Sequence, residues 1–123
     1  MTETPTQTVF VVDDEPVIAS TLAAILNASG FQATAFTNPV EAIEAAERQG
    51  PGLLISDVVM PGMNGVDLAI HLKSLSPKCR VLLFSGQAAS ADLLNAAKEA
   101  GHDFEFLLKP VHPKDLLAAI RKL

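Results

Sequence analysis

The sequence contains no tryptophan, no tyrosine and a single cysteine. Cys79 therefore has no partner for an internal disulfide, and no metal-ligating residues stand around it. A lone thiol of this kind is usually a small buried hydrophobic side chain, and we expect that here. The chain also lacks a phosphate-cradling Ser/Thr/Gly loop after its first predicted strand. Together with the absence of aromatic rings that stack on a flavin, this argues against a flavin-binding electron carrier.

Positive charge is scarce as well. The 9 lysines and arginines are outnumbered by 14 aspartates and glutamates, which gives a net charge of −5, and the basic residues are scattered along the chain. Nucleic-acid-binding modules usually carry a basic face and membrane-surface proteins a basic cluster, so we expect neither role. No apolar run reaches the ~18 residues of a membrane span, and residues 1–8 lack the basic-then-apolar order of a signal peptide. We expect a cytoplasmic protein with a flexible tail over residues 1–8.

What the chain does have is enough apolar material for one domain, with 49% hydrophobic residues in a length of 123. Short β-branched or leucine-rich runs predict five strands: Val9–Val12, Phe31–Phe36, Leu53–Asp57, Arg80–Phe84 and about Phe104–Leu108. Helical patterns predict five helices: Pro16 to about Gly30, Asn38-Pro39 to about Arg48, a third after Gly65, about Ala89–Ala100, and Pro113 to the end.

Strands and helices that alternate in this way define an α/β domain with a parallel sheet. Strands this apolar need helices over both faces of the sheet. The right-handed crossover rule then favours a flavodoxin-like doubly wound sheet with strand order 2-1-3-4-5. We therefore expect a single domain over residues 9–123.

Polar side chains follow four of the five predicted strands. Asp13 and Asp14 follow the first strand, Asp57 ends the third, and Ser85 and Lys109 follow the fourth and fifth. In an open parallel sheet, ligands bind beyond the carboxyl ends of the strands. Taken singly, the Asp pair reads as an acidic helix start, Asp57 as a turn residue and Lys109 as a surface charge. Their convergence at one edge favours a common site instead.

The chemistry of these groups indicates what such a site does. Three neighbouring carboxylates repel one another and attract a cation, and hard oxygen ligands with room for waters suit Mg²⁺. A carboxylate neutralised in this way can act as a nucleophile toward a phosphoryl donor and form an aspartyl-phosphate. Lys109 would stabilise the developing charge and the Ser85 hydroxyl would donate to a phosphoryl oxygen. The site therefore predicts phosphoryl transfer.

Four segments of the chain resemble the response-regulator receiver domain of two-component signalling, over Val9 to Leu123. The segments are Val11-Val12-Asp13-Asp14-Glu15-Pro16, Asp57-Val58-Val59-Met60-Pro61-Gly62-Met63-Asn64-Gly65, Ser85-Gly86 and Lys109-Pro110. The second segment is the specific one, since an isolated Asp-Asp pair or Lys-Pro is common. The resemblance implies a domain that catalyses only its own phosphorylation and dephosphorylation and is not otherwise an enzyme.

The resemblance also implies a role for each site residue. Asp57 would accept the phosphoryl group, Ser85 would be the switch hydroxyl, and Lys109 would sense the phosphate. The Lys109–Pro110 peptide bond would be cis. The implied Mg²⁺ ligands are Asp14 directly, Asp13 mostly through water, Asp57, and the backbone carbonyl of Val59.

The partners implied by the resemblance are proteins. A sensor histidine kinase or a phosphotransfer protein would supply the phosphoryl group, and the face of helix four, strand five and helix five would read it out. Helix five carries more apolar residues than one core-facing stripe needs. This indicates either a protein partner or homodimer through helices four and five, or an alanine-rich helix chosen for its helix propensity. The chain is either a stand-alone receiver or part of a larger protein.

Two details depart from the common receiver pattern. The switch aromatic, three residues before the lysine, would be Phe106, but the segment from Gly101 to Lys109 is one residue longer than the common receiver spacing. Either Phe104 is therefore a rival for this role, or a bulge absorbs the extra residue. Two positions that tune dephosphorylation are Val59 and Gln87, and an apolar Val59 cannot orient an attacking water. We therefore expect a long-lived phosphoryl group.

Two other functions are alternatives to phosphoryl transfer by a receiver domain. A hydrolase of the haloacid dehalogenase type needs its nucleophile and acid two residues apart after the first strand, whereas Asp13 and Asp14 are adjacent. A non-phosphorylated receiver acting as a protein-binding scaffold is the alternative, and such a module is expected to have lost Asp57, Asp14 or Lys109. All three are present.

Overall fold

The computed structural model of the chain describes residues 7–86 and 90–123. Its strands are β1 (Thr8–Val12), β2 (Gln32–Phe36), β3 (Leu53–Asp57), β4 (Arg80–Ser85) and β5 (Glu105–Leu108). Its helices are α1 (Pro16–Ala28), α2 (Pro39–Arg48), α3 (Gly65–Leu75), α4 (Ser90–Glu99) and α5 (Pro113–Lys122). Most of the tail expected over residues 1–8, together with Gln87 and Ala89, lies outside the described residues.

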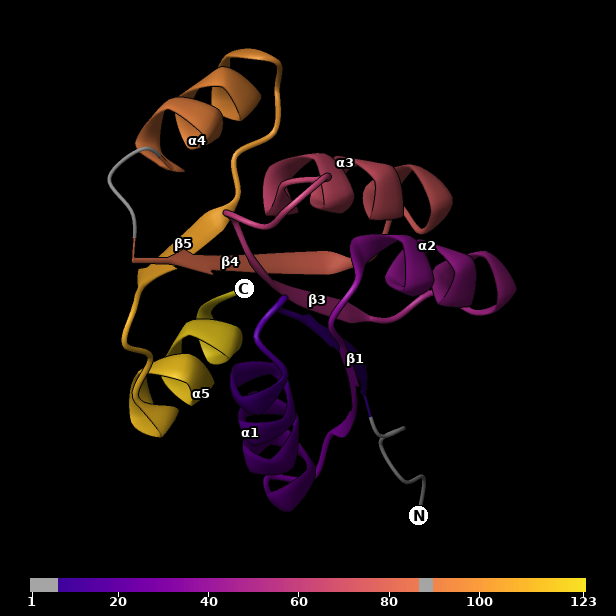
Figure 1. Cartoon of the computed structure of the whole chain (residues 1–123), viewed down its shortest axis with the longest axis vertical. Helices are drawn as coiled ribbons and strands as arrows, with labels where there is room; N and C mark the ends of the chain where they lie inside the picture. The colour runs from indigo at the N-terminus through magenta and orange to yellow at the C-terminus, as the bar shows by residue number, and fades with distance from the viewer. Residues whose placement is uncertain (1–6, 87–89) are drawn as a thin grey trace.

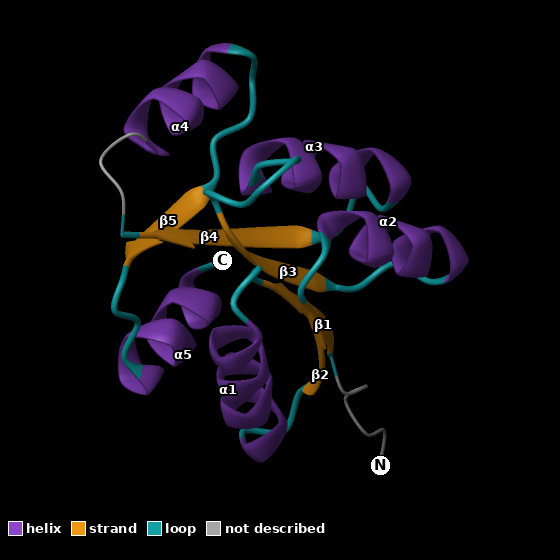
Figure 2. Ribbon diagram, viewed as in Figure 1, coloured by secondary structure: helices purple, strands orange, loops and turns teal. Residues whose placement is uncertain are grey.

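The five strands form one parallel sheet in the order β2-β1-β3-β4-β5, which confirms the predicted topology. Figures 1 and 2 show α2, α3 and α4 on one side of the sheet and α1 and α5 on the other. Two buried clusters correspond to these two faces, because alternate strand residues point in opposite directions. On β4, for example, Leu83 packs beneath α3, whereas Leu82 and Phe84 pack beneath α1 and α5.

Local sequence accounts for where the helices begin. Pro39 and Pro113 occupy the first turns of α2 and α5, where a missing N–H costs nothing. The side chains of Asn38, Asn64 and His112 accept hydrogen bonds from the first turns of α2, α3 and α5. The helix starts predicted at Asn38-Pro39 and at Pro113 are therefore confirmed.

The boundaries of several elements differ from the predicted ones by a residue. β1 begins at Thr8 because its pairing with β2 extends to Gln32. β5 begins at Glu105 and pairs with β4 over four successive positions, so the described ladder has no bulge. Leu75 is 41% exposed because it stands at the last turn of α3.

Candidate functional site

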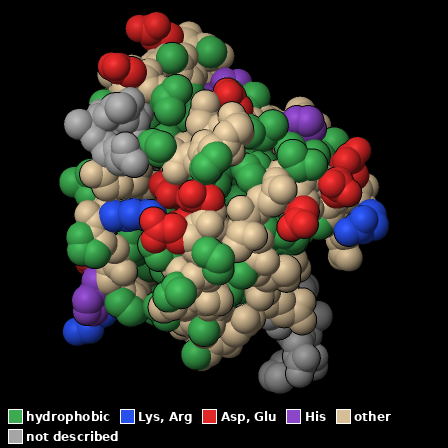
Figure 3. Space-filling model, in the orientation of Figure 1, with side chains coloured by type: hydrophobic (Ala, Val, Ile, Leu, Met, Phe, Trp, Pro, Cys, Tyr) green, Lys and Arg blue, Asp and Glu red, His purple; other side chains and the backbone are tan. Residues whose placement is uncertain are grey.

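The carboxyl ends of β1, β3, β4 and β5 bring the predicted polar residues together at one edge of the sheet. They border an open cavity of about 550 Å³. Figure 3 shows acidic side chains gathered on this face beside a basic one. The cavity is lined by Asp14, Glu15, Asp57, Val59, Met60, Pro61, Ser85, Gly86 and Lys109. Residues at or just beyond the ends of four different strands therefore lie close together in space.

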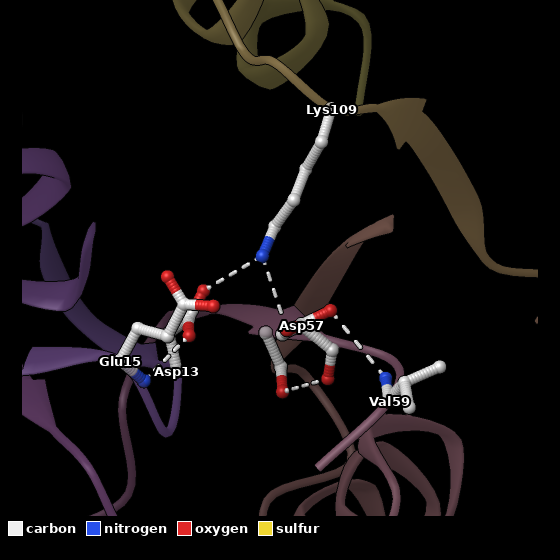
Figure 4. A network of polar contacts seen from close by, with 6 residues as sticks. Asp13, Glu15, Asp57, Val59 and Lys109 are labelled. Atoms are coloured by element: carbon white, nitrogen blue, oxygen red, sulfur yellow. Dashed lines mark hydrogen bonds and ion pairs between the residues drawn. The ribbon is translucent and has the colours of Figure 1, made fainter. Parts of the chain in front are cut away.

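Lys109 is the centre of the polar network in Figure 4. Its Nζ lies 3.2 Å from Asp13 Oδ2 and 3.1 Å from Asp57 Oδ2, so one ammonium bridges carboxylates from β1 and β3. The Lys109 side chain is only 22% exposed, and that of Asp57 9%. Hydrogen bonds between charged groups in such partly buried sites are stronger than neutral ones. The bridge fixes Lys109 beside the oxygen of Asp57.

The three carboxylates are not equivalent. Asp13 is fully buried, and both of its oxygens are occupied, since Oδ1 accepts the Glu15 N–H at 2.9 Å and Oδ2 faces Lys109. Asp14 is exposed and lines the cavity. One oxygen from each of Asp13, Asp14 and Asp57 lies within 4.8 Å of the others. This set of hard oxygen donors, two of them open to the cavity, fits a divalent cation that keeps several waters.

Burial controls the acid–base state of the site. Desolvation raises the pKa of Asp57 above its ordinary value, and the nearby Asp13 adds to this, although the Lys109 ammonium and the Val59 N–H act in the opposite direction. Desolvation lowers the pKa of Lys109, but its contacts with Asp57 and Asp13 outweigh it, so this pKa is raised. The raised pKa keeps Lys109 a cation, whereas ionisation of Asp57 costs free energy in the folded protein.

The backbone around Asp57 is held by its neighbours in β3 and α3. The buried Ser56 hydroxyl donates to the Asp57 carbonyl at 2.9 Å, and the Gly65 N–H donates to the Val58 carbonyl at 2.8 Å. A Cβ at Gly65 would lie 2.0 Å from the Asp57 carbonyl oxygen, so the start of α3 reaches this position only with glycine. The Val59 N–H lies 3.4 Å from Asp57 Oδ1.

Glu15 and Phe84 contact predicted site residues, although the sequence assigned neither of them a role. Glu15 lines the cavity and its backbone N–H holds Asp13; its position directly after the Asp pair was the available signal. Phe84 lies beneath the Lys109 ammonium, at 5.1 Å from ring centroid to Nζ. No local pattern reveals that contact, because it depends on how β4 and the loop after β5 meet.

The remaining predictions concern residues around the site. The Lys109–Pro110 peptide bond is cis. Cys79 is buried and free, as expected. Phe104 and Phe106 pack against the same core cluster, but Phe104 precedes β5 and stacks on His102, whereas Phe106 pairs with Leu83 within the sheet.

The apolar surplus predicted on α5 is mostly absorbed by the core. Leu116 and Ile120 are buried, and Leu117, Ala119 and Leu123 pack partly buried against the same cluster. The apolar surface that α5 leaves open to a partner is therefore small.

The doubly wound sheet and the acidic cavity at its carboxyl edge define a receiver-like α/β domain. The solved CheY-like receiver domain protein of Methanospirillum hungatei superimposes with a TM-score of 0.85 at 25% identity, covering 96% of this chain and 93% of that one. The chain belongs to the response regulator receiver domain family, which it matches over residues 9–121. It is thus a receiver domain of two-component systems, and receiver domains are a family of signalling domains.

Curated relatives differ in how much of their length this chain spans. It is 34% identical over 116 residues to the probable transcriptional regulatory protein TcrX of Mycobacterium tuberculosis, covering 94% of this chain but 49% of that protein. It is 31% identical over 115 residues to the response regulator receiver protein CpdR of Brucella abortus, covering 94% of each. The chain therefore spans about half the length of TcrX and nearly all of CpdR.

Among the described residues, no helix has the length and apolar character needed to cross a bilayer.

Proposed function

We propose that Asp57 accepts a phosphoryl group, in a Mg²⁺-dependent reaction, from a sensor histidine kinase or a phosphotransfer protein. The observation that carries this proposal is the Lys109 bridge to Asp13 and Asp57, within a set of three carboxylates that can share one cation. A surface lysine or an acidic helix start would not produce this arrangement. The alternative of a scaffold that is never phosphorylated gains no support from the intact site.

Asp57, Lys109 and Ser85 have different proposed roles in the phosphoryl transfer. An Asp57 carboxylate oxygen forms the new bond to phosphorus while the bond from phosphorus to the donor nitrogen breaks, and the electron pair stays with the donor imidazole. Lys109, fixed 3.1 Å from Asp57 Oδ2, lies where it can stabilise the charge of the phosphoryl oxygens. Ser85 lines the same cavity and is proposed as the donor to a phosphoryl oxygen.

The cation site is proposed on Asp14, Asp57 and the backbone carbonyl of Val59, with Asp13 acting mostly through water. The distribution of exposure supports this, because Asp14, Asp57 and Val59 line the cavity whereas Asp13 is buried with both oxygens occupied. When bound, Mg²⁺ supplies positive charge that neutralises the carboxylates and the incoming phosphoryl oxygens.

Phosphorylation is proposed to switch the face formed by α4, β5 and α5, with the domain acting in the cytoplasm. It adds roughly −1.5 to −2 charge beside Ser85 and Lys109, which biases the domain between two states. Phe106 is the better candidate for the switch aromatic, since Phe104 is stacked on His102. The output is proposed to pass to a protein partner or a second copy through α4 and α5, with no direct contact to nucleic acid or membrane.

The test is phosphorylation by acetyl phosphate, followed by intact-protein mass spectrometry with Mg²⁺ and with a chelator. The wild-type protein is expected to gain one phosphoryl group only when Mg²⁺ is present. Asp57→Asn should gain none, because its amide is not a nucleophile, and the matched control Asp103→Asn, an exposed aspartate outside the cavity, should behave as wild type. Phosphorylation of Asp57→Asn, or none in the wild type, would overturn the proposal and favour the scaffold.

A further inference from the structure

Lys109 reaches the acidic cavity from the loop after β5, and it lies against Phe84 and Ser85 at the end of β4 and against Gly86, which follows the strand. The Lys109 N–H donates to the Ser85 carbonyl at 3.1 Å, which fixes the backbone end of the side chain. A Cβ at Gly86 would lie 3.4 Å from Lys109 Cβ, so the stem passes close to that residue. At the far end, Nζ lies 5.1 Å from the ring centroid of Phe84.

Phe84 is held more rigidly than the lysine above it. Its side chain is 1% exposed and belongs to the core cluster beneath α1 and α5. Its backbone pairs with Asp57 of β3 and with Leu107 of β5, and its carbonyl accepts the Val58 N–H at 3.0 Å. The ring is therefore fixed relative to the strand that carries the nucleophile.

An ammonium within about 6 Å of a ring centroid is attracted by the negative face of the ring, and more strongly where water is partly excluded. The Lys109 Nζ therefore contacts the carboxylates of Asp13 and Asp57 and also lies over the ring of Phe84. An aliphatic side chain at this position would fill the core but would not attract the ammonium. Lys109 would then sample more rotamers and meet the phosphoryl group less often.

We propose that Phe84 is a positioning residue, which holds the Lys109 ammonium by a cation–π contact in the geometry that phosphoryl transfer to Asp57 requires. This inference rests on the proposed function for its kinetic consequence, but the contact itself exists in the unphosphorylated protein. Phe84 does not touch the reacting atoms, and it acts through Lys109.

The experiment is a double-mutant cycle on the rate of phosphorylation by acetyl phosphate with Mg²⁺. Phe84→Leu is expected to slow the reaction by about threefold to tenfold, which corresponds to about 0.6–1.4 kcal/mol. In a Lys109→Met background the same substitution should have no further effect, because the ammonium it positions is gone. An equal slowing in both backgrounds would show that Phe84 acts through the core alone and would overturn the proposal.

Two controls separate positioning from folding. Leu82→Val alters a buried neighbour in the same cluster and strand, and it should lower stability without changing the rate. Phe84→Met fills about the same volume as Phe84→Leu with a flexible, unbranched side chain, and it should slow the reaction as Phe84→Leu does. A wild-type rate in the folded Phe84→Met protein would contradict the cation–π account.

A spectroscopic readout keeps this inference distinct from the proposed function. The ring current of Phe84 should shift the terminal methylene protons of Lys109 upfield, and the shift should vanish in Phe84→Leu but persist in Leu82→Val. Absence of phosphorylation in the wild type would defeat the proposed function while the proton shift still tests the contact. Absence of the shift would defeat the inference even in a protein that is phosphorylated normally.

Discussion

Val59 forms part of the wall of the acidic cavity, two residues beyond the proposed phosphoacceptor. Its backbone N–H points toward Asp57 Oδ1, as Figure 4 shows, but its side chain carries no group that can orient a water for attack on phosphorus. The structure thus places an apolar, β-branched side chain on the wall of the cavity beside the proposed phosphoacceptor. This is the physical basis for expecting a long-lived phosphoryl group.

Replacing Val59 with Asn should shorten the lifetime of the phosphorylated protein several-fold, because the amide can hydrogen-bond an attacking water. The measurement is the decay of the phosphorylated mass after removal of acetyl phosphate. Val59→Ala is the matched control, since it opens the same space without a polar group and should change the lifetime little. Equal acceleration by both substitutions would mean that access, rather than orientation of water, limits hydrolysis.

The strand β2 shows what an element needs beyond its own sequence. It is an edge strand, and edge strands expose unpaired backbone groups that can recruit other chains. Here the side chain of Asn27, on α1, donates to the Ala33 carbonyl at 3.1 Å and accepts from the Ala33 N–H at 2.8 Å. One amide side chain therefore takes the place of a neighbouring strand at this position.

Substituting Asn27 with Ala should remove both hydrogen bonds and lower the free energy of unfolding by about 1 kcal/mol, after allowing for the better helix propensity of alanine. The Ala33 amide should exchange with solvent faster by hydrogen-exchange NMR, while amides of β3 keep their protection. Asn95→Ala on α4, another exposed helical asparagine, should leave Ala33 unaffected. Unchanged exchange at Ala33 in the Asn27 variant would disprove this role.

The elements themselves could be predicted from the sequence because their signals are local. Proline at the start of α2 and α5 and an apolar run such as Leu53–Asp57 each point to one structure within a few residues. Contacts such as Asn27 with Ala33, or Phe84 with Lys109, join two different segments of the chain. Neither segment has a sequence pattern that indicates the contact. The ends of β1 and β5 were missed by one residue because pairing with a neighbouring strand, not local preference, decides where a strand begins.

The acidic site was predictable for a different reason, which concerns the topology of the complete sheet. Parallel strands carry their carboxyl ends to one edge, so a residue that follows a strand is placed by the fold alone. This rule brought Asp13, Asp57 and Lys109 together correctly. It could not reveal that Asp13 is buried and Asp14 exposed, because that depends on how the loop after β1 turns.

The carboxylates of Asp13, Asp14 and Asp57 lie close together at the carboxyl edge of the sheet, and this lowers the stability of the whole fold. Burial and the neighbouring Asp13 raise the pKa of Asp57 in the folded protein despite the Lys109 ammonium. A group whose folded pKa is raised contributes stability in acid, below its ordinary value of 3.8, and this contribution is lost as the pH rises through the folded value. Ionisation of Asp57 therefore costs the folded state stability as the pH rises.

Asp57→Asn should accordingly be more stable than the wild-type protein at neutral pH in the presence of a chelator, and the gain should disappear in acid. The neutral amide avoids the desolvation of a charge, while Lys109 keeps its contact with Asp13. Denaturant midpoints measured at neutral pH and below pH 3.8 test this, with Asp103→Asn as the exposed control that should shift neither midpoint.

Adding Mg²⁺ should reverse the order of stability, since a cation that binds only the folded state stabilises the wild type more than a variant that has lost one carboxylate ligand. A variant less stable than the wild type in chelator would mean that the Lys109–Asp57 bond outweighs the cost of burying the charge. The charged groups of the acidic cavity would then stabilise the fold even without a cation, instead of destabilising it until a cation binds.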